Sequence, residues 1–196
     1  HNYFFANGID KVRPGGLMVF ITSQGSLIGG KDGNRMRSYL ASKADMLGAF
    51  KLPTTAFDEA GTSVVTDIVI MRKRNEDNIQ SPNAQDFLTV GKREEYSSYY
   101  GPAHTAPINE YFKEHPDNII GKIAVEKNQY GDYAVTVKQK DGSDVAQDLE
   151  RAMQSLPEGE YKARTREKAK SFDTVSASKH AAANDKTRDY EYYMSG

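Results

Sequence analysis

The sequence contains no cysteine. This absence excludes disulfide bonds, zinc–thiolate centres and thiol nucleophiles together, and it fits a reducing compartment, so we expect a cytoplasmic protein. The four histidines, at positions 1, 104, 115 and 180, lack the spacing of metal ligands, and we therefore expect no metal site. No apolar run approaches the roughly 20 residues that cross a bilayer, which predicts no membrane partner.

Apolar residues and net charge are also low. Hydrophobic residues make up 38% of the 196-residue chain and the mean hydropathy is -0.70, so a core cannot extend through the whole sequence. The net charge is -1, but residues 1–74 are basic and the remainder is acidic. A basic, apolar first part is compatible with binding to nucleic acid. The chain opens at His1 directly on an apolar stretch, and we expect this to be a cut or processed end.

The residues up to 26 are typical of an α/β domain. Residues 2–13 are expected to form a helix that ends at the helix-breaking sequence Pro14-Gly15-Gly16. The unbroken apolar run 17–21 then predicts a strand buried on both faces, as in a parallel sheet. Residues 22–26 follow as a loop at the carboxyl end of that strand, the edge at which open α/β sheets bind their ligands.

A helix and a pair of strands come next. Apolar residues recur near one face of a helix predicted over 34–47. Short apolar runs predict strands over 49–52 and 64–71. Only the residues 53–63 separate these strands, too few for a parallel crossover with its helix, so we expect an antiparallel hairpin with a long loop.

Beyond residue 75 the sequence becomes polar. Residues 119–127 and 133–139 alternate around a turn sequence, which predicts a β-hairpin, and residues 144–156 have the spacing of an amphipathic helix. Charge dominates from residue 157 onward, as in segments that stay disordered or order only against a partner. The expected organisation is an α/β domain over 1–75, a linker or long loop over 76–110, a hairpin and helix over 111–156, and a disordered tail over 157–196.

Short motifs follow one another in a set order along the first 75 residues. They are His1-Asn2-Tyr3-Phe4-Phe5, Arg13-Pro14-Gly15-Gly16-Leu17, Phe20-Ile21-Thr22-Ser23-Gln24-Gly25, Arg37-Ser38-Tyr39-Leu40, Leu47-Gly48-Ala49-Phe50-Lys51-Leu52-Pro53, Ala56-Phe57 and Thr62-Ser63-Val64-Val65-Thr66-Asp67-Ile68-Val69-Ile70. Together they resemble the second half of the catalytic domain of N6-adenine DNA methyltransferases, above all in methylase–helicase proteins of bacterial mobile elements. Residues 108–155 more loosely resemble the segment that follows the methylase domain in those proteins.

The resemblance implies an α/β fold, namely the second half of a Rossmann-like methyltransferase sheet that ends in an antiparallel hairpin. It also implies methyl transfer from S-adenosylmethionine to adenine N6 in double-stranded DNA. The family's glycine-containing cofactor loop and its Asn/Asp-Pro-Pro-Tyr/Phe motif belong upstream of the matching region, and the chain has no Pro-Pro. We therefore expect a fragment with no catalytic residue of its own, inactive alone. Its expected partners are double-stranded DNA and the upstream half of the domain. Whether a helicase domain is fused downstream stays open at this point.

The resemblance also suggests residues that contact the substrate. Phe57 matches an aromatic residue that packs on the extruded adenine in the family, and such stacking is worth about 1–3 kcal/mol per base. Its alternative role is to close the loop onto the sheet. Thr22 and Ser23 lie at the ligand-binding edge, where they either contact the nucleotide or only cap the turn.

Charged residues near that edge have two interpretations each. Lys31, Arg35 and Arg37 are expected to contact DNA phosphates, and the alternative is an ordinary solvated helix face. Asp67 interrupts a buried apolar strand, so we expect it to have a structural partner.

Two other functions stay open at this point. One is a non-catalytic DNA-binding or interaction module that kept this half of the fold. The other is a small-molecule methyltransferase, which shares the sheet and is only weakly disfavoured by the long loop over 53–63.

Overall fold

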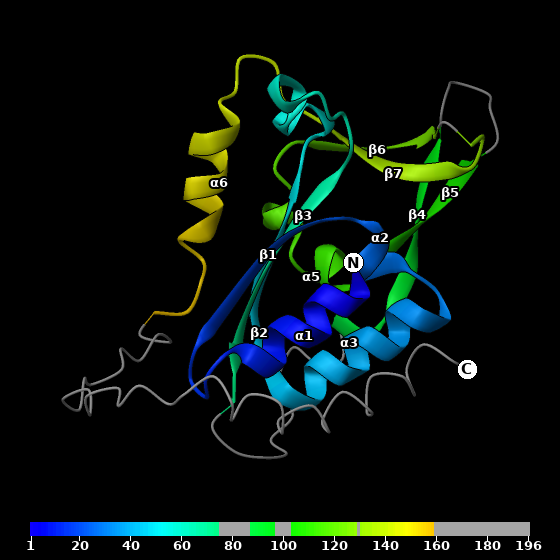
Figure 1. The fold of residues 1–196 in the computed structure, drawn as a ribbon. Helices are drawn as coiled ribbons and strands as arrows, with labels where there is room; N and C mark the ends of the chain where they lie inside the picture. Colours follow the sequence, from blue (N-terminus) through cyan, green and yellow to red (C-terminus); the bar gives the residue numbers. More distant parts are fainter. Residues whose placement is uncertain (75–86, 97–102, 129, 159–196) are drawn as a thin grey trace, which may run out of the picture. The chain divides into compact units, whose positions relative to one another are not determined.

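The strands β1 (Leu17–Ser23), β2 (Ala44–Leu52) and β3 (Thr66–Lys73) form a sheet in the order β1-β3-β2 (Figure 1). β3 is antiparallel to both neighbours, which confirms the predicted antiparallel hairpin and means that β1 and β2 run in the same direction. The computed structural model describes residues 1–74, 87–96, 103–128 and 130–158. The expectation of a disordered tail therefore falls, from residue 159 onward, outside the described residues.

The register divides the side chains of this sheet between two faces. Residues that oppose one another in antiparallel strands point to the same side of the sheet. The register thus groups Met18, Met71 and Met46 on one face, and Ile21, Ile68 and Phe50 on the other.

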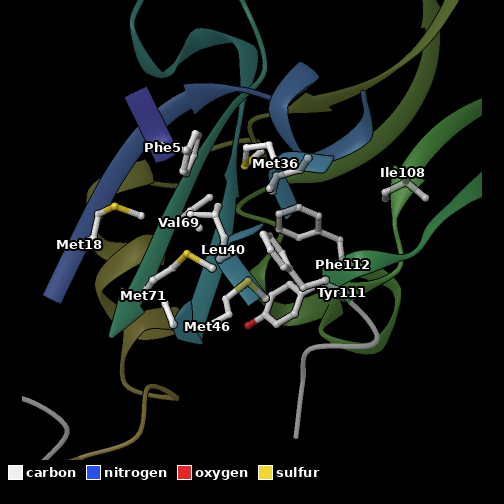
Figure 2. Close-up of a cluster of buried hydrophobic side chains, with 14 of the residues drawn as sticks. Phe5, Met18, Met36, Leu40, Met46, Val69, Met71, Ile108, Tyr111 and Phe112 are labelled. Atoms are coloured by element: carbon white, nitrogen blue, oxygen red, sulfur yellow. The ribbon is translucent and has the colours of Figure 1, made fainter. Parts of the chain in front are cut away.

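Helices from three parts of the chain cover the first face. They are α1 (Asn2–Lys11), α3 (Lys31–Lys43) and the short α5 (Tyr111–Glu114). Figure 2 shows Phe5, Leu40 and Phe112, one from each helix, in the buried cluster that also contains Val69 of β3. Full burial of one such side chain contributes about 1.5–3 kcal/mol, so this face carries the main core.

The structure corrects the predicted helix over 34–47. α3 begins at Lys31 and ends at Lys43, and Ala44 already belongs to β2. Asp45 explains why the strand starts so early, because its carboxylate accepts hydrogen bonds from Arg72 Nη2 at 3.0 Å and Arg74 Nε at 2.8 Å. These ion pairs and the pairing with β3 outweigh the helical preference of the local residues.

The structure also corrects the expectation for the strand over 17–21. We expected burial on both faces, but among the described strands β1 lies at the edge of the sheet and pairs with β3 alone. Val19 and Ile21 are 58% and 59% exposed, on the face opposite to the main core. The apolar run is present, but within the described residues nothing covers its second face.

A single helix packs on the second face of the sheet. α6 (Val145–Met153), predicted over 144–156, lies against Phe50, Ile68 and their neighbours with the apolar side that includes Leu149. Asp144 caps its first turn, accepting from Ala146 N at 2.8 Å and Gln147 N at 3.2 Å.

Asp144→Ala is expected to lower the free energy of unfolding by about 1 kcal/mol, because it leaves two amide donors at the helix start without their acceptor. Urea denaturation followed by far-UV circular dichroism measures this change. Asp144→Ser should retain most of the stability, and Asp141→Ala, at an exposed position in the preceding turn, serves as a control. Equal losses for Asp144→Ala and Asp141→Ala would contradict the capping role.

Two β-hairpins follow the central sheet. The strands β4 (Val90–Tyr96) and β5 (Ala103–Asn109) are antiparallel, as are β6 (Lys122–Lys127) and β7 (Tyr133–Lys138). The β6–β7 hairpin confirms its prediction, whereas β4 and β5 occupy much of the expected linker over 76–110. In β5 the alternation of buried apolar and exposed residues is limited to Ala106 and Ile108 on either side of Pro107. So short a pattern did not predict the strand from the sequence.

Candidate functional site

The loop after β1 is closed by its own side chains. Thr22 is buried, and its Oγ1 lies 3.1 Å from Ser26 Oγ and 3.1 Å from His1 Nδ1. Ser26 belongs to the one-turn helix α2 (Gly25–Ile28). Ser23 is half-buried at the end of β1, opposite Thr66. In this arrangement the Thr22 hydroxyl holds the turn, which matches the capping interpretation, while Ser23 keeps part of its surface accessible.

Strand β7 lies across the carboxyl ends of β1 and β2. Gln24 Nε2, directly after β1, donates to Val135 O at 3.0 Å. Thr54 Oγ1, just beyond β2, donates to Val137 O at 3.3 Å. Figure 1 shows β6 and β7 crossing the end of the central sheet at which these loops lie. The edge where a ligand is expected therefore has a wall formed by the second hairpin.

Phe57 lies in the loop between β2 and β3, between the 3-10 turns Thr54–Ala56 and Asp58–Ala60. Its side chain is half-buried and packs against the cluster around Phe50, beside α6. Its carbonyl accepts from Ala60 N at 2.9 Å and Thr62 N at 3.1 Å, so the loop has a defined shape here. The contact agrees with loop closure, and part of the ring stays exposed.

The three basic residues after β1 are not equivalent. Lys31 and Arg35 are exposed on α3, as phosphate contacts require. Arg37 is only 2% exposed, and its Nη1 donates to the carbonyls of Ser26 at 3.4 Å and Gly29 at 3.3 Å. Desolvation lowers the pKa of this guanidinium from its ordinary value. The prediction of Arg37 as a DNA contact is thus corrected, because the side chain holds the α2–α3 loop from inside.

Asp67 has the structural partner that the sequence predicted, and the partner is Lys51. Lys51 Nζ lies 2.6 Å from Asp67 Oδ1, and both side chains are almost completely buried. The same Nζ lies 4.5 Å from the centre of the Phe112 ring. Burial raises the pKa of Asp67, although the charge of Lys51 and its hydrogen bond act in the opposite direction. The lysine in the apolar sequence Phe50-Lys51-Leu52 was the signal that sequence reasoning missed.

Two buried asparagines, which sequence reasoning also missed, attach the downstream segment to the first part of the chain. Asn109 Nδ2 donates to Leu27 O at 3.0 Å and to Phe87 O at 2.9 Å. Asn118 Nδ2 donates to Ala49 O at 3.1 Å. Asn118 thus joins the segment after α5 to β2, and Asn109 joins the end of β5 to α2.

The described residues place limits on two other kinds of site. Among them, no three His, Asp or Glu side chains gather closely enough to hold a metal ion. None of the helices in this part of the chain has the length and apolar character to span a membrane.

The chain is similar to a protein of a mobile element. Over 72 residues it is 46% identical to the Defense against restriction protein B of Escherichia phage P1. This stretch covers 37% of the chain and 3% of the phage protein, so the chain corresponds to a small part of that relative. No protein-family model matches the chain, and no solved structure matches it. The similarity links the chain to proteins concerned with restriction.

Proposed function

We propose that this chain is the second half of a DNA adenine-N6 methyltransferase domain that acts in defence against restriction. The motif order over residues 1–75 supports the methyltransferase part of the proposal. The 46% identity to the Defense against restriction protein B of Escherichia phage P1 supports the biological setting. Methylation of adenine in DNA is a direct chemical route to such protection, because it changes the base edge that a restriction nuclease reads.

The observation that carries the proposal is the incomplete central sheet. The outer edge of β1 pairs with none of the described strands, and Val19 and Ile21 on its second face are more than half exposed. An exposed apolar edge strand is a ready template for another strand, and an uncovered apolar face needs a packing partner. An upstream half of the same α/β domain supplies both, since its strands extend the sheet beyond β1 and its helices cover Val19 and Ile21.

We assign S-adenosylmethionine to the upstream half, because the family's glycine-containing cofactor loop belongs upstream of the matching region. At the end of β1, Thr22 Oγ1 and Gln24 Nε2 are already hydrogen-bonded within the chain, whereas Gln24 Oε1 has no hydrogen-bond partner among the described residues. When bound, the cofactor supplies the methyl group, and this chain supplies the substrate side of the pocket. Phe57 stacks on the adenine, Ser23 lies beside the nucleotide, and Lys31 and Arg35 contact phosphates.

Methyl transfer to DNA tests this function. The chain joined to its upstream half is expected to transfer tritiated methyl groups from S-adenosylmethionine to adenine N6 in duplex DNA. The isolated chain should transfer none, and calorimetry should detect no micromolar binding of the cofactor. Tight binding by the isolated chain would contradict the assignment of the cofactor site to the other half.

Phe57→Ala in the complete domain is expected to reduce methylation of duplex DNA by roughly tenfold to hundredfold, since stacking on a flipped base is worth about 1–3 kcal/mol. The fluorescence of 2-aminopurine at the target position should fall in parallel, while cofactor affinity stays the same. Phe57→Tyr and Phe57→Trp keep an aromatic face and should retain most of the activity. If Phe57 only closes the loop, the alanine variant will instead lose thermal stability, cofactor binding and activity together.

The second candidate function is a DNA-binding or interaction module without catalysis. It is favoured by the phage relative, whose name refers to defence against restriction and does not specify methylation. The same assay separates the two functions, because a module of this kind binds the duplex without transferring any methyl group in the complete domain.

A further inference from the structure

The turn between β6 and β7 presents an aromatic ring to solvent. Tyr130 is 80% exposed, more than any other large hydrophobic side chain among the described residues. Single exposed aromatic residues are common on protein surfaces, so exposure alone indicates nothing. Three further observations indicate a role for the exposed ring. They are the hydrogen bonds of the turn around Tyr130, the charge of the hairpin, and the position of the hairpin in the fold.

Hydrogen bonds fix the shape of this turn. Asn128 Oδ1 accepts from Tyr130 N at 2.9 Å and from Asp132 N at 3.1 Å, and Asn128 N donates to Asp132 O at 2.8 Å. Gly131 donates to Asn128 O at 3.0 Å and has a φ of 88°, a left-handed conformation that glycine adopts without strain. These hydrogen bonds join the described residues on both sides of Tyr130, which reduces the entropy lost when its ring binds a partner.

The hairpin that carries the turn is basic. Residues 122–140 contain four lysines, at positions 122, 127, 138 and 140, against Glu126 and Asp132. Glu126 forms an ion pair with Lys138, which lowers the pKa of that carboxyl. Lys127, at the base of the turn, lies with its Nζ 5.6 Å from the centre of the Tyr133 ring. Lys127 lies next to the turn, whereas the other three lysines lie toward the opposite end of the hairpin. An exposed aromatic ring with a lysine at the base of its turn suits a partner that has both stacking faces and negative charge, as nucleic acid does.

The position of the hairpin connects it to the candidate site. The carbonyl of Val137 is bonded to Thr54, in the loop that carries Phe57, and Tyr130 lies at the other end of β7. A strand of this length extends about 20 Å, which corresponds to about six base pairs of duplex at 3.4 Å each. DNA that places a base at Phe57 can thus extend along the hairpin to the turn.

We infer that the β6–β7 turn contacts duplex DNA about six base pairs from the target base, with Tyr130 stacking on a base or deoxyribose and Lys127 binding a phosphate. The inference rests on the proposed function for the location of the target base, whereas DNA contact by the turn is measurable without any methylation. Because Tyr130 is exposed and makes no contribution to the core, its substitution leaves the fold intact.

Fluorescence anisotropy of a labelled duplex with the 196-residue chain tests the inference. Tyr130→Ala is expected to weaken binding about fivefold to hundredfold, and Tyr130→Trp should restore it. Lys127→Ala should reduce the slope of log affinity against log salt by about one, because one phosphate contact is lost. Tyr3→Ala is the matched control, since Tyr3 is also an exposed tyrosine, at 54%, on α1.

The outcomes separate this inference from the proposed function. Equal affinity of wild type and Tyr130→Ala, or no binding of the duplex at low salt, would overturn the role of the turn. A loss of affinity in Tyr130→Ala supports it even if the complete domain transfers no methyl group, and in that case only the methyltransferase proposal fails. An equal loss in Tyr3→Ala would show that the effect is not specific to the turn and would also overturn the inference.

Discussion

Lys51→Met is expected to lower the free energy of unfolding by about 3–5 kcal/mol, as the removal of one partner from a buried ion pair does. The change preserves the length of the side chain but leaves the Asp67 carboxylate without the Nζ that lies 2.6 Å from its Oδ1. Asp67 Oδ2 has no hydrogen-bond partner among the described residues, so nothing there replaces the lost cation. Urea denaturation of the chain at pH 7 measures the difference.

The loss in Lys51→Met should depend on pH. Burial already raises the pKa of Asp67 in the folded protein, and removal of the lysine raises it further. The folded state of the variant therefore binds a proton more readily than the unfolded state, and its stability should rise as the pH falls from 8 towards 5. A loss that is the same at every pH in this range would show that the charge on Asp67 is not its cause.

Two further variants complete the test of this pair. Lys51→Met combined with Asp67→Asn removes both charges and should recover most of the stability, since replacement of a whole buried pair is often neutral. Arg151→Met breaks the exposed pair with Asp148 and should change stability by less than about 0.5 kcal/mol. A loss below about 1 kcal/mol in Lys51→Met would contradict the importance of the pair.

Ile21→Lys is expected to prevent association with the upstream half while leaving this chain folded. Ile21 is 59% exposed here, so a lysine at this position should change stability by no more than about 0.5 kcal/mol. In the complete domain that we propose, the same side chain is covered, and an unpaired buried charge costs several kcal/mol, which corresponds to more than about a hundredfold loss of affinity. Calorimetric titration of the two halves measures this loss.

The control for Ile21→Lys places the same charge elsewhere. Tyr130→Lys changes another exposed hydrophobic position, at 80%, on the β6–β7 turn, and it should associate with the upstream half like wild type. Association of Ile21→Lys with unchanged affinity would mean that the second face of β1 stays in solvent, and the proposal of an incomplete sheet would then be wrong.

The central sheet could be predicted where apolar runs and turn residues agree. The run 17–21 and the short spacing between the last two strands were sufficient for β1 and for the antiparallel pairing of β2 with β3. The start of β2 could not be predicted, because Ala44 and Asp45 extend a helical pattern. Only Arg72 and Arg74, far along the chain, favour the strand.

The candidate site was predicted less completely, again because its contacts join residues that are far apart in the sequence. The sequence identified Asp67 as a residue that needs a partner, but pairing with Lys51 depends on the register of β2 with β3. It grouped Arg37 with Lys31 and Arg35, although only the fold turns Arg37 inward to the carbonyls of Ser26 and Gly29. The roles of Phe57 and Ser23 in binding the nucleotide stay predictions.

β3 is the last of the three central strands to be synthesised, yet it lies between the other two. β1 and β2 do not pair with each other, so these three strands form no hydrogen-bonded ladder with one another until residues 66–73 have left the ribosome. At 5–20 residues per second, β2, whose partner in the described sheet is β3, then waits for roughly 1–4 s. During this interval the nascent chain exposes an unpaired apolar strand, which is the kind of segment that chaperones bind and that aggregates when they do not.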